Sequence, residues 1–245
     1  MRNNENSILQ AIECVNNQSY KDIEHIVFDG ESTDSTWDII KNNISENLIA
    51  IRESDDGIYD ALNRSIKYAS GDIIGILHSD DLFADRFVIE DVVAEFNKNN
   101  LDVVYGDLLY VSLNPPHKII REWIAGKFEK NKLRYGWMPP HPTMFLKSEV
   151  YKDIGEYDTK YKISADYKFI LQLFSKNYSC GYLPRVLTIM RMGGVSNKNF
   201  FSIMRKTKED LLAINESNVG SILTVFFKNI RKLNQFFKYE KKRKF

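Results

Sequence analysis

Hydrophobic residues over the first hundred positions follow two different spacings along the chain. Helical spacing predicts helices near residues 8–16, 37–40 and 58–69, and short apolar runs predict strands at residues 23–28, 48–51 and 73–77. Strands that alternate with helices are typical of a parallel, doubly wound α/β sheet. We therefore expect an α/β half that ends near Gly106. Such a half normally opens with a strand, whereas residues 1–6 are too polar and too short to form one.

The stretch from Asp72 to Asp81 is the most informative of these predicted strands. Residues 73–77 are apolar or Gly, which predicts a short strand buried on both faces, and the run stops at His78-Ser79-Asp80-Asp81. Open α/β sheets bind their ligands at the carboxyl ends of strands. Two carboxylates side by side repel each other unless a cation or a proton relieves them. The pair therefore indicates a divalent metal site or, alternatively, a helix N-cap for the segment near residues 86–96.

The composition is that of an ordinary globular chain. Of its 245 residues, 43% are hydrophobic and 27% are charged, which allows one domain with a substantial core, or one domain with a second lobe. Cys14 and Cys180 lie far apart, without the spacing of a metal or redox site. No signal-peptide pattern and no apolar run of membrane-spanning length is found, so we expect a reducing, cytoplasmic location.

The net charge of +1 conceals an uneven distribution. Residues 228–245 carry eight Lys or Arg and one Glu, a charge of +7, so the rest of the chain has a charge of −6. Aliphatic and aromatic residues stand among the basic ones from about Ser221 onward. This pattern is typical of an interfacial helix on anionic lipid, and the alternative is a C-terminal helix that packs on the body. Nucleic-acid binding is disfavoured, because no nucleic-acid-binding motif accompanies the basic residues.

Several short motifs follow one another in a recognisable order. They are Gln18-Ser19-Tyr20-Lys21-Asp22-Ile23-Glu24, Asp29-Gly30-Glu31-Ser32-Thr33-Asp34-Ser35-Thr36, Gly57-Ile58-Tyr59-Asp60-Ala61-Leu62-Asn63, Ala69-Ser70-Gly71-Asp72, His78-Ser79-Asp80-Asp81, Pro140-His141-Pro142-Thr143, Gly155-Glu156-Tyr157-Asp158 and Ser164-Ala165-Asp166-Tyr167. With these motifs the chain resembles a family 2 glycosyltransferase with the GT-A fold, of the bacterial surface-polysaccharide kind. The match runs from about Ser7 to Ser196 and rests on the order and spacing of the motifs together.

The resemblance implies an α/β fold. The expected architecture is a GT-A-type, Rossmann-like, doubly wound and mostly parallel sheet with a smaller acceptor-side lobe and C-terminal helices. Residues 1–106 would form the nucleotide-sugar-binding half, residues 107–198 the acceptor-side half with the catalytic base, and residues 199–245 a helical, basic tail.

The resemblance also implies a divalent metal, Mn²⁺ or Mg²⁺. The family equivalent of Asp81 binds the metal, and Asp80 lies beside the ribose and the ion. The metal and fixed hydrogen-bond donors would neutralise the charge on the leaving diphosphate. His78 stands where an Asn is common, and we expect it to change the tuning of the site rather than its chemistry.

Three further residues are expected near the donor nucleotide. Asp29 stands at the end of its strand, where the family's acidic residue approaches the base or the ribose, and the alternative is a turn-forming Asx residue. Asp56, with the adjacent Asp55, and Asn63 border the same crevice. Their alternatives are a solvated loop and an amide on a helix face.

Asp166 is the expected catalytic base. The family supplies an Asp at the head of a helix in its second half, and the acceptor hydroxyl must lose its proton as the new bond forms. Apolar residues at positions 167, 170, 171 and 174 give this helix a buried face, so N-capping is the alternative role of Asp166. Direct displacement by the activated hydroxyl would invert the anomeric carbon.

His141 and Arg191 complete the set of candidates. His141 lies between two prolines on a stiff loop that would line the acceptor pocket, and a purely structural histidine is the alternative. Arg191 precedes Gly193-Gly194-Val195-Ser196, a flexible stretch that would close over the donor diphosphate. A surface arginine is the alternative.

The function implied by the resemblance is inverting glycosyl transfer of the hexosyltransferase type. The donor would be a nucleoside-diphosphate sugar, with a UDP-sugar favoured. The acceptor would be a hydroxyl of a polyprenyl-linked or growing surface polysaccharide such as O-antigen, capsule or exopolysaccharide. The basic tail would hold the protein peripherally on anionic lipid at the inner face of the cytoplasmic membrane.

The absence of the usual first strand leaves another function open. Family members usually begin with a strand of the Ile-Ile-Thr-Val type whose end touches the base, so a misassigned start, an alternative start codon or a truncated gene is indicated. The alternative is a truncated, non-catalytic remnant that binds at most a nucleotide or a partner. A nucleotidyltransferase is disfavoured, because no Gly-rich phosphate loop with basic residues lies near the N-terminus.

Overall fold

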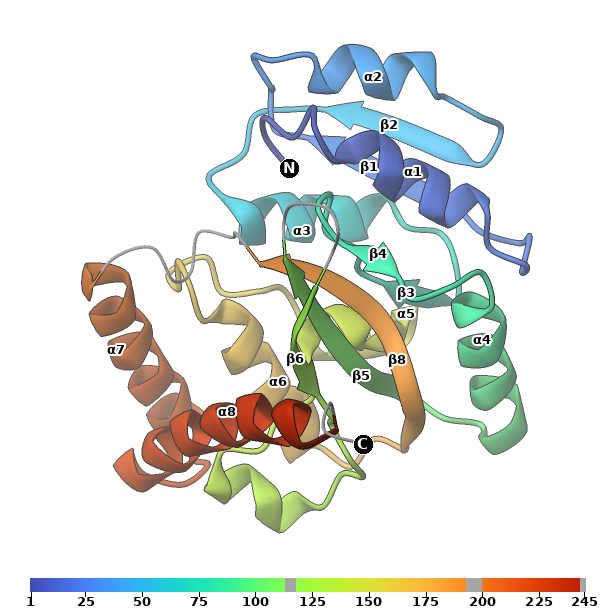
Figure 1. The fold of residues 1–245 in the computed structure, drawn as a ribbon. Helices are drawn as coiled ribbons and strands as arrows, with labels where there is room; N and C mark the ends of the chain where they lie inside the picture. The colour runs from blue at the N-terminus through green and yellow to red at the C-terminus, as the bar shows by residue number, and fades with distance from the viewer. Residues whose placement is uncertain (113–117, 193–199, 243–245) are drawn as a thin grey trace.

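The fold, seen in a computed structural model, is a layered α/β arrangement (Figure 1). The structure describes residues 1–112, 118–192 and 200–242, with the backbone alone for residues 192, 200, 233–234 and 236–242. The helices are α1 (Ile8–Asn16), α2 (Thr36–Asn42), α3 (Ile58–Tyr68), α4 (Val88–Asn99), α5 (Ser148–Ile154), α6 (Ala165–Ser175), α7 (Phe200–Glu216) and α8 (Ile222–Lys242), with short 3₁₀ helices η1 (Lys130–Tyr135) and η2 (His141–Thr143). The strands are β1 (His25–Asp29), β2 (Leu48–Arg52), β3 (Ile73–Gly75), β4 (Leu82–Phe83), β5 (Val103–Ser112), β6 (Ile119–Trp123), β7 (Phe145–Lys147) and β8 (Cys180–Met192).

The strands form two separate sheets. β1 and β2 make a parallel pair. The larger sheet has the order β3-β7-β5-β8-β4, with β6 beside β5. β5 and β8 are parallel, whereas β7 is antiparallel to both of its neighbours, β4 is antiparallel to β8, and β6 is antiparallel to β5. The predicted α/β class is confirmed, and the larger sheet is mixed rather than mostly parallel. The alternation of strands and helices in the first half of the sequence does not indicate that a later strand, β7, lies between β3 and β5 in the sheet.

The helices follow the hydrophobic spacing of the sequence closely. In α6, Tyr167, Ile170, Leu171 and Phe174 are all buried, as their i, i+3, i+4 and i+7 positions predict. They belong to a large core cluster beneath β5 and β7. A smaller cluster around Ile8 and Val27 holds α1, α2 and the two-stranded sheet together.

The predicted strand at residues 73–77 is shorter in the structure. β3 covers only Ile73–Gly75, and Ile73 and Ile74 are half-buried instead of buried on both faces. The reason is that, within the described chain, β3 pairs with β7 along one edge and faces a cavity along the other.

The C-terminal helices pack against the body at their inner faces. Val225 is buried, and the Lys228 Nζ lies 2.9 Å from an Asp210 carboxylate oxygen and 3.1 Å from the centre of the Tyr167 ring. The packed-helix alternative therefore describes this part of α8. Across the three described ranges, no helix combines the length and the apolar character needed to cross a bilayer.

Candidate functional site

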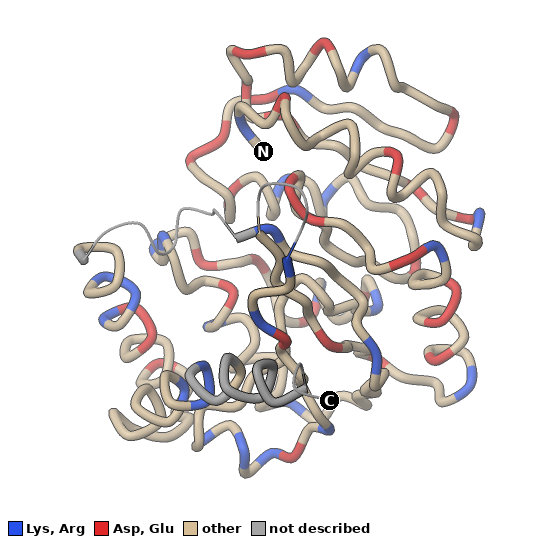
Figure 2. Tube along the Cα trace, in the orientation of Figure 1, with Lys and Arg blue, Asp and Glu red and all other residues tan. Residues whose placement is uncertain are grey.

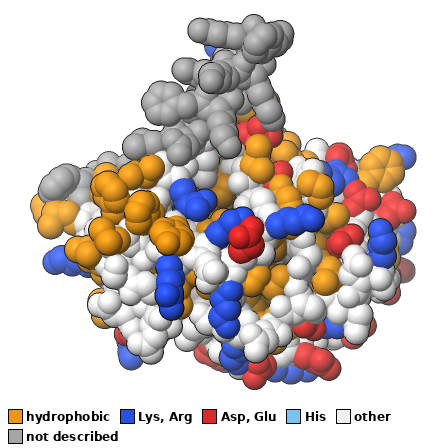
Figure 3. All heavy atoms as spheres, turned by 90° about the horizontal axis from the view of Figure 1, so that it is seen from below, with side chains coloured by type: hydrophobic (Ala, Val, Ile, Leu, Met, Phe, Trp, Pro, Cys, Tyr) orange, Lys and Arg blue, Asp and Glu red, His pale blue; other side chains and the backbone are white. Residues whose placement is uncertain are grey.

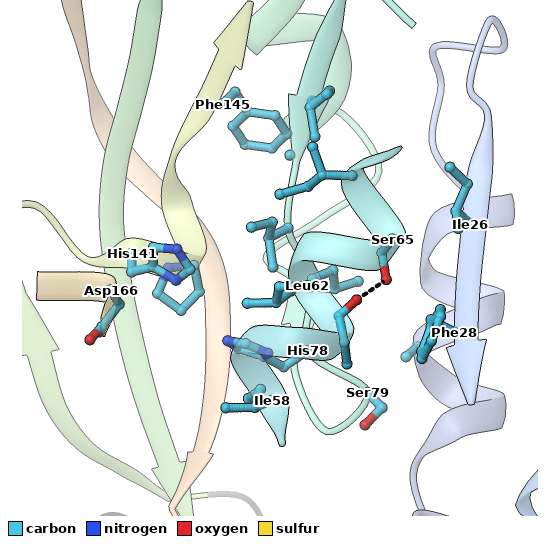
Figure 4. A pocket seen from close by; sticks show the side chains of 18 of the residues that line it. Ile26, Phe28, Ile58, Leu62, Ser65, His78, Ser79, His141, Phe145 and Asp166 are labelled. Atoms are coloured by element: carbon cyan, nitrogen blue, oxygen red, sulfur yellow. Dashed lines mark hydrogen bonds between the residues drawn. The ribbon is translucent and has the colours of Figure 1, made fainter. Parts of the chain in front are cut away.

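One large cavity collects four of the eight candidate residues. Its volume is about 2350 Å³, and it runs from the space between β1 and β3, past the carboxyl end of β3, to α6, α7 and α8. Asp80, His141, Asp166 and Arg191 all line it. Figure 4 shows His78, His141 and Asp166 gathered on one side of it, with Ile26 and Phe28 of β1 on the other.

The two adjacent carboxylates have different surroundings. Asp80 lines the cavity, whereas the side chain of Asp81 is completely buried, and neither of its carboxylate oxygens has a hydrogen-bond partner among the described residues. Helix α4 begins only at Val88, and it is Asp85 that accepts a hydrogen bond from the backbone N–H of Phe87 at its start. Capping of α4 by Asp80 or Asp81 is therefore excluded.

Burial gives Asp81 an unusual acidity. Burial and, to a lesser extent, the charge on Asp80 raise the pKa of the Asp81 carboxyl to about 8, against the opposing effect of Arg191. A buried carboxylate with two unpartnered oxygens, next to a second carboxylate, is a fit for a hard divalent cation. The described residues contain no cluster of three or more His, Cys, Asp or Glu around one point. Asp80 and Asp81 would therefore need other ligands, such as diphosphate oxygens, to complete a metal site.

Asp166 stands at the start of α6 without acting as its cap. The backbone N–H groups of residues 162–164 donate instead to the carboxylate of Glu209 on α7. The Tyr59 hydroxyl lies 3.2 Å from Asp166 Oδ1 and 2.7 Å from the carbonyl oxygen of Ile163. The Asp166 carboxylate thus remains available to the cavity, with one tyrosine hydroxyl positioned against it.

His141 lies on η2 and is buried beside the same carboxylate. Its Nε2 is 2.8 Å from the Tyr157 hydroxyl, and its ring centre is 6.3 Å from that of His78. Burial lowers the pKa of His141 to about 4, against a small upward effect from Asp166. Burial also lowers the pKa of His78. Both imidazoles are therefore neutral near pH 7, so they supply hydrogen bonds and shape rather than charge.

The donor-side candidates are divided by the structure. Asp29 is fully buried, and its carboxylate accepts hydrogen bonds from the backbone N–H and the hydroxyl of Ser32. Its Oδ2 lies 3.5 Å from Arg52 Nε. These are the contacts of the turn-forming alternative. Asp56 is exposed, whereas its neighbour Asp55 lines the cavity. A role for Asp29 or Asp56 in donor binding stays a prediction.

Asn63 connects two parts of the fold. Its Nδ2 donates to the Tyr157 carbonyl oxygen at 2.9 Å, and its Oδ1 accepts from the Tyr157 N–H at 2.8 Å. Both polar ends of the amide are thus used in fixing the loop after α5 to α3. Asn63 holds Tyr157, and through it His141, in place.

Arg191 lies next to the last residue of β8, near the carboxylate pair. It is 9% exposed, and its guanidinium donates to the side chain of Gln10 on α1. Arg191 therefore lines the cavity, and the alternative of a surface arginine is wrong. Residues 193–199, which include the predicted flexible stretch, lie outside the described chain.

A group of basic residues at the far end of the cavity escaped the sequence reasoning. It consists of Arg121, Arg205, Lys206, Lys228 and Lys232. Figure 2 shows Lys and Arg along α7 and beside the described part of α8. Burial lowers the pKa of Lys232 to about 8, and the nearby charges of Lys206 and Arg121 act in the same direction. The sequence signal for Lys228 and Lys232 was the basic tail, which was interpreted as a lipid-binding helix or, alternatively, as a helix packed on the body; Arg121, Arg205 and Lys206 gave no such signal.

Comparison with known proteins identifies the family. Residues 1–155 match the model of "Glycosyl transferase family 2", and the chain belongs to this family. A relative from Mycobacterium bovis, named "PGL/p-HBAD biosynthesis glycosyltransferase", is 31% identical over 169 residues, which cover 67% of this chain and 63% of the relative. The Escherichia coli protein "UDP-Glc:alpha-D-GlcNAc-diphosphoundecaprenol beta-1,3-glucosyltransferase WfgD" is 31% identical over 133 residues, or 54% of this chain and 51% of WfgD. The chain thus spans less than two thirds of the length of these relatives.

Solved structures share the fold at low sequence identity. TarS 1–349 of S. aureus in complex with UDP has a TM-score of 0.66 and 17% identity, with 94% of this chain and 67% of the TarS 1–349 chain covered. The mannosyltransferase PcManGT of Pyrobaculum calidifontis, in complex with GDP-Man and Mn²⁺, has a TM-score of 0.64 and 16% identity, with 93% and 67% covered. These likenesses support the GT-A arrangement of the fold.

The buried state of His141 predicts a pH dependence of stability. The pKa of His141 is about 4 in the folded chain, below its usual 6.5. As the pH falls from 6.5 toward 4, the unfolded chain therefore binds a proton at this histidine that the folded chain does not, and the free energy of unfolding decreases. At pH 5 the loss amounts to about 2 kcal/mol, since one pKa unit is worth about 1.4 kcal/mol. Urea unfolding of His141→Gln at pH 7 and pH 5 should therefore show a smaller acid loss than the unaltered chain. Tyr157→Phe is the control, because it removes the hydrogen-bond partner of His141 without a titration in this range. An equal acid loss in His141→Gln and the unaltered chain would contradict the assignment.

Proposed function

We propose that this protein is an inverting, metal-dependent glycosyltransferase that uses a nucleoside-diphosphate sugar. The observation that carries the proposal is the convergence of Asp80, Asp166 and Arg191 on one cavity, from three separate parts of the chain. A carboxylate pair at the end of a strand, a free carboxylate at the head of a helix and an arginine are the groups that diphosphate departure and hydroxyl activation require. Family membership supports the same reaction class.

In this proposal the residues divide the work between two ends of the cavity. Asp80 and Asp81 would hold a divalent cation, which supplies positive charge to the diphosphate when bound. Arg191 would add a fixed charge on the same side. Asp166 accepts the proton of the acceptor hydroxyl, with its orientation set by Tyr59, while the neutral His78 and His141 shape the adjoining wall. Attack from the Asp166 side, opposite to the diphosphate, inverts the anomeric carbon.

The donor is proposed to be a UDP-sugar. This choice is supported by WfgD, whose name includes UDP-Glc, and by the UDP complex of TarS. The competing GDP-sugar is supported by the GDP-Man complex of PcManGT. Asp55, which follows β2, lies against Gly30 in the loop after β1. It lines the cavity on the side where the base and ribose would lie.

The acceptor is proposed to carry a phosphate group, as a lipid-linked glycan does. WfgD is named for a diphosphoundecaprenol-linked sugar. In this chain, Asp210 offsets the charges of Lys206 and Lys228, whereas no ion pair of Lys232 is found among the described residues. A partly buried lysine without a counter-ion is favourably placed for an anionic group of the acceptor.

Donor binding is the first test of the proposal. We expect UDP to bind by calorimetry in the presence of Mn²⁺ and to lose at least about tenfold in affinity with EDTA, because metal and diphosphate share the site. Asp81→Asn should abolish the effect of Mn²⁺. The exposed Asp38→Asn on α2 serves as a matched control and should leave it unchanged. Binding of GDP in place of UDP would show that the donor is a GDP-sugar. Equal affinity for UDP with Mn²⁺ and with EDTA would contradict the proposed metal dependence.

Transfer itself tests Asp166. Asp166→Asn should reduce UDP release in the presence of a polyprenyl-diphosphate-linked N-acetylglucosamine by about 10²–10⁴-fold, the usual contribution of a positioned base. Donor affinity should stay unchanged, because the carboxamide keeps the shape of the side chain. More than about a tenth of the original rate in Asp166→Asn would overturn its role. Donor binding without transfer in the unaltered chain would favour the non-catalytic alternative.

Peripheral membrane binding is proposed through the outer face of α8. Ile222, Leu223 and Phe226 are each more than half exposed, and Figure 3 shows hydrophobic side chains gathered on the underside of the molecule. Arg231, which is exposed, follows on the same helix, whereas Lys228 and Lys232 face the cavity, and further basic residues follow in the sequence at positions 238 and 241–244. The side chains of residues 236–245 lie outside the described part of the chain. An apolar face beside basic residues is typical of a helix that rests on anionic lipid.

Vesicle sedimentation tests this surface. The double variant Leu223→Ser/Phe226→Ser should bind vesicles containing phosphatidylglycerol more weakly at low salt, because it removes apolar area that would enter the interface. Ile44→Ser, at an exposed site between α2 and β2, is the matched control. Deletion of residues 228–245 is a poorer test, since it also removes the buried Lys228 from Asp210. Unchanged sedimentation of the double variant would rule out this surface.

A further inference from the structure

The loop that leads into α6 is held by a residue of another helix. The backbone N–H groups of residues 162–164 donate to the Glu209 carboxylate of α7 at 3.2, 2.8 and 2.9 Å. The N–H groups at the start of a helix have no partner within the helix and are satisfied by side chains or water. Glu209 therefore fixes the backbone through which the chain enters α6, just before Asp166.

Glu209 takes the place of a helix cap at this position. Ser164 is the N-cap residue of α6, where a serine hydroxyl commonly accepts a hydrogen bond from a backbone N–H of the first turn. Its side chain makes no such bond, and its hydroxyl oxygen is buried without a partner among the described residues. A carboxylate is also favoured beside the N-terminus of a helix, where the helix dipole is positive. The first turn of α6, which carries Asp166, is thus held from α7 and not by its own N-cap.

Helix α7 can hold this turn because it is itself fixed to α6. The two helices lie side by side (Figure 1), and Ile214 of α7 is completely buried in the core cluster that includes the buried face of α6. Asp210, the residue after Glu209, forms an ion pair with Lys228. The Lys228 ammonium in turn lies over the ring of Tyr167, the residue after the proposed base. Two adjacent carboxylates of α7 therefore act on the chain on both sides of that base.

The held backbone sets the surroundings of the Asp166 carboxylate. The Tyr59 hydroxyl is 2.7 Å from the Ile163 carbonyl oxygen and 3.2 Å from Asp166 Oδ1, so a movement of Ile163 alters both contacts. Burial and, to a lesser extent, the charge on Asp166 raise the pKa of Tyr59, so its hydroxyl keeps the proton that it donates. Ile163 and Asp166 line the cavity, whereas Glu209 is not among the described residues that line it. Any effect of Glu209 on a bound acceptor must therefore pass through other residues.

We propose that Glu209 is a positioning residue for Asp166, whose carboxylate it aims at the acceptor hydroxyl by holding the backbone of residues 162–164. The inference rests on the role proposed above for Asp166. A positioned base typically contributes about 10²–10⁴-fold, and misplacement of a reacting group by about 1 Å costs about 10²-fold. Loss of Glu209 should remove part of the contribution of Asp166. Donor binding should stay intact, because Asp80 and Arg191 are attached to other elements.

Steady-state kinetics of Glu209→Ala test the proposal, with UDP-glucose as donor and polyprenyl-diphosphate-linked N-acetylglucosamine as acceptor. We expect kcat to fall by about 10–10²-fold, while the affinity for UDP with Mn²⁺ stays within about twofold. Glu209→Gln should recover most of the rate, because its carbonyl oxygen can accept from Ile163 and Ser164 as Oε2 does now. Glu216→Gln is the matched control and should keep the full rate. It also lies on α7, but its carboxylate pairs with Lys168 of α6.

The double variant Asp166→Asn/Glu209→Ala separates positioning from a general structural role. If Glu209 acts through Asp166, the double variant should match Asp166→Asn in rate within about twofold, because no base remains to be positioned. A further loss as large as that of Glu209→Ala alone would make Glu209 a structural residue only and would overturn the inference.

The carboxyl ¹³C resonance of Asp166 gives a readout that needs no turnover, and Asp166→Asn assigns it. We expect this resonance to shift or broaden in Glu209→Ala and to keep its position in Glu209→Gln and Glu216→Gln. An unchanged resonance in Glu209→Ala would contradict the inference. An equal shift in Glu209→Gln would assign the effect to the lost charge, with the same consequence. If Glu209→Ala does not fold, Glu209→Asp replaces it in all three measurements, since its shorter side chain withdraws the carboxylate from the loop.

Failure of this inference is distinguishable from failure of the proposed function. A full rate in Asp166→Asn would refute the proposed base, and the role of Glu209 with it. A reduced rate in Asp166→Asn together with a full rate in Glu209→Ala would refute the role of Glu209 alone. Loss of UDP affinity by about tenfold or more in Glu209→Ala would also overturn it, because the effect would then extend beyond the base. If the unaltered chain transfers no sugar to this acceptor, the Asp166 resonance decides.

Discussion

The pairing of β8 with both β4 and β5 is the contact on which the rest of the cavity depends. Leu82 and Phe83 of β4 lie opposite Ile189 and Thr188, which holds the preceding carboxylate pair against the larger sheet. The Thr188 hydroxyl donates to the Pro142 carbonyl oxygen at 2.8 Å and so fixes the loop of His141. The same strand carries Arg191, next to its last residue, beside Asp81.

The close approach of β8 to β5 also explains one glycine. A side chain on Gly106 would bring its Cβ to 2.5 Å from the Cγ of Leu187, which is completely buried. Only a residue without a Cβ lets the two strands pair here, where their register also shifts around Asp107. This irregularity lies a few residues before Tyr110 of β5 and Arg191 of β8, which both line the cavity.

The sequence predicted local structure well and long-range pairing poorly. The stripe in α6 and the alternation over the first half are visible in the spacing of apolar residues, because burial imposes that spacing on each element. The antiparallel insertion of β7 between β3 and β5 depends on contacts between distant segments, which no local pattern records. The same holds for side-chain roles. Asp80 and Asp166 could be selected from their motifs, whereas the ties of Asn63 to Tyr157 and of Lys228 to Asp210 depend on partners more than 15 residues away in sequence.

The separation into two sheets has a consequence for how the two ends of the cavity respond to change. The two-stranded sheet has its own core around Ile8, Val27 and Leu48, and a sheet of two strands is marginally stable by itself. It carries Asp29, whereas Asp80, Asp81 and Asp166 are attached to the larger sheet and its helices. A shift of the smaller sheet would therefore move Asp29 relative to the other three carboxylates, which would keep their positions relative to one another. The relative position of these two sets of carboxylates thus depends on how the two sheets are joined.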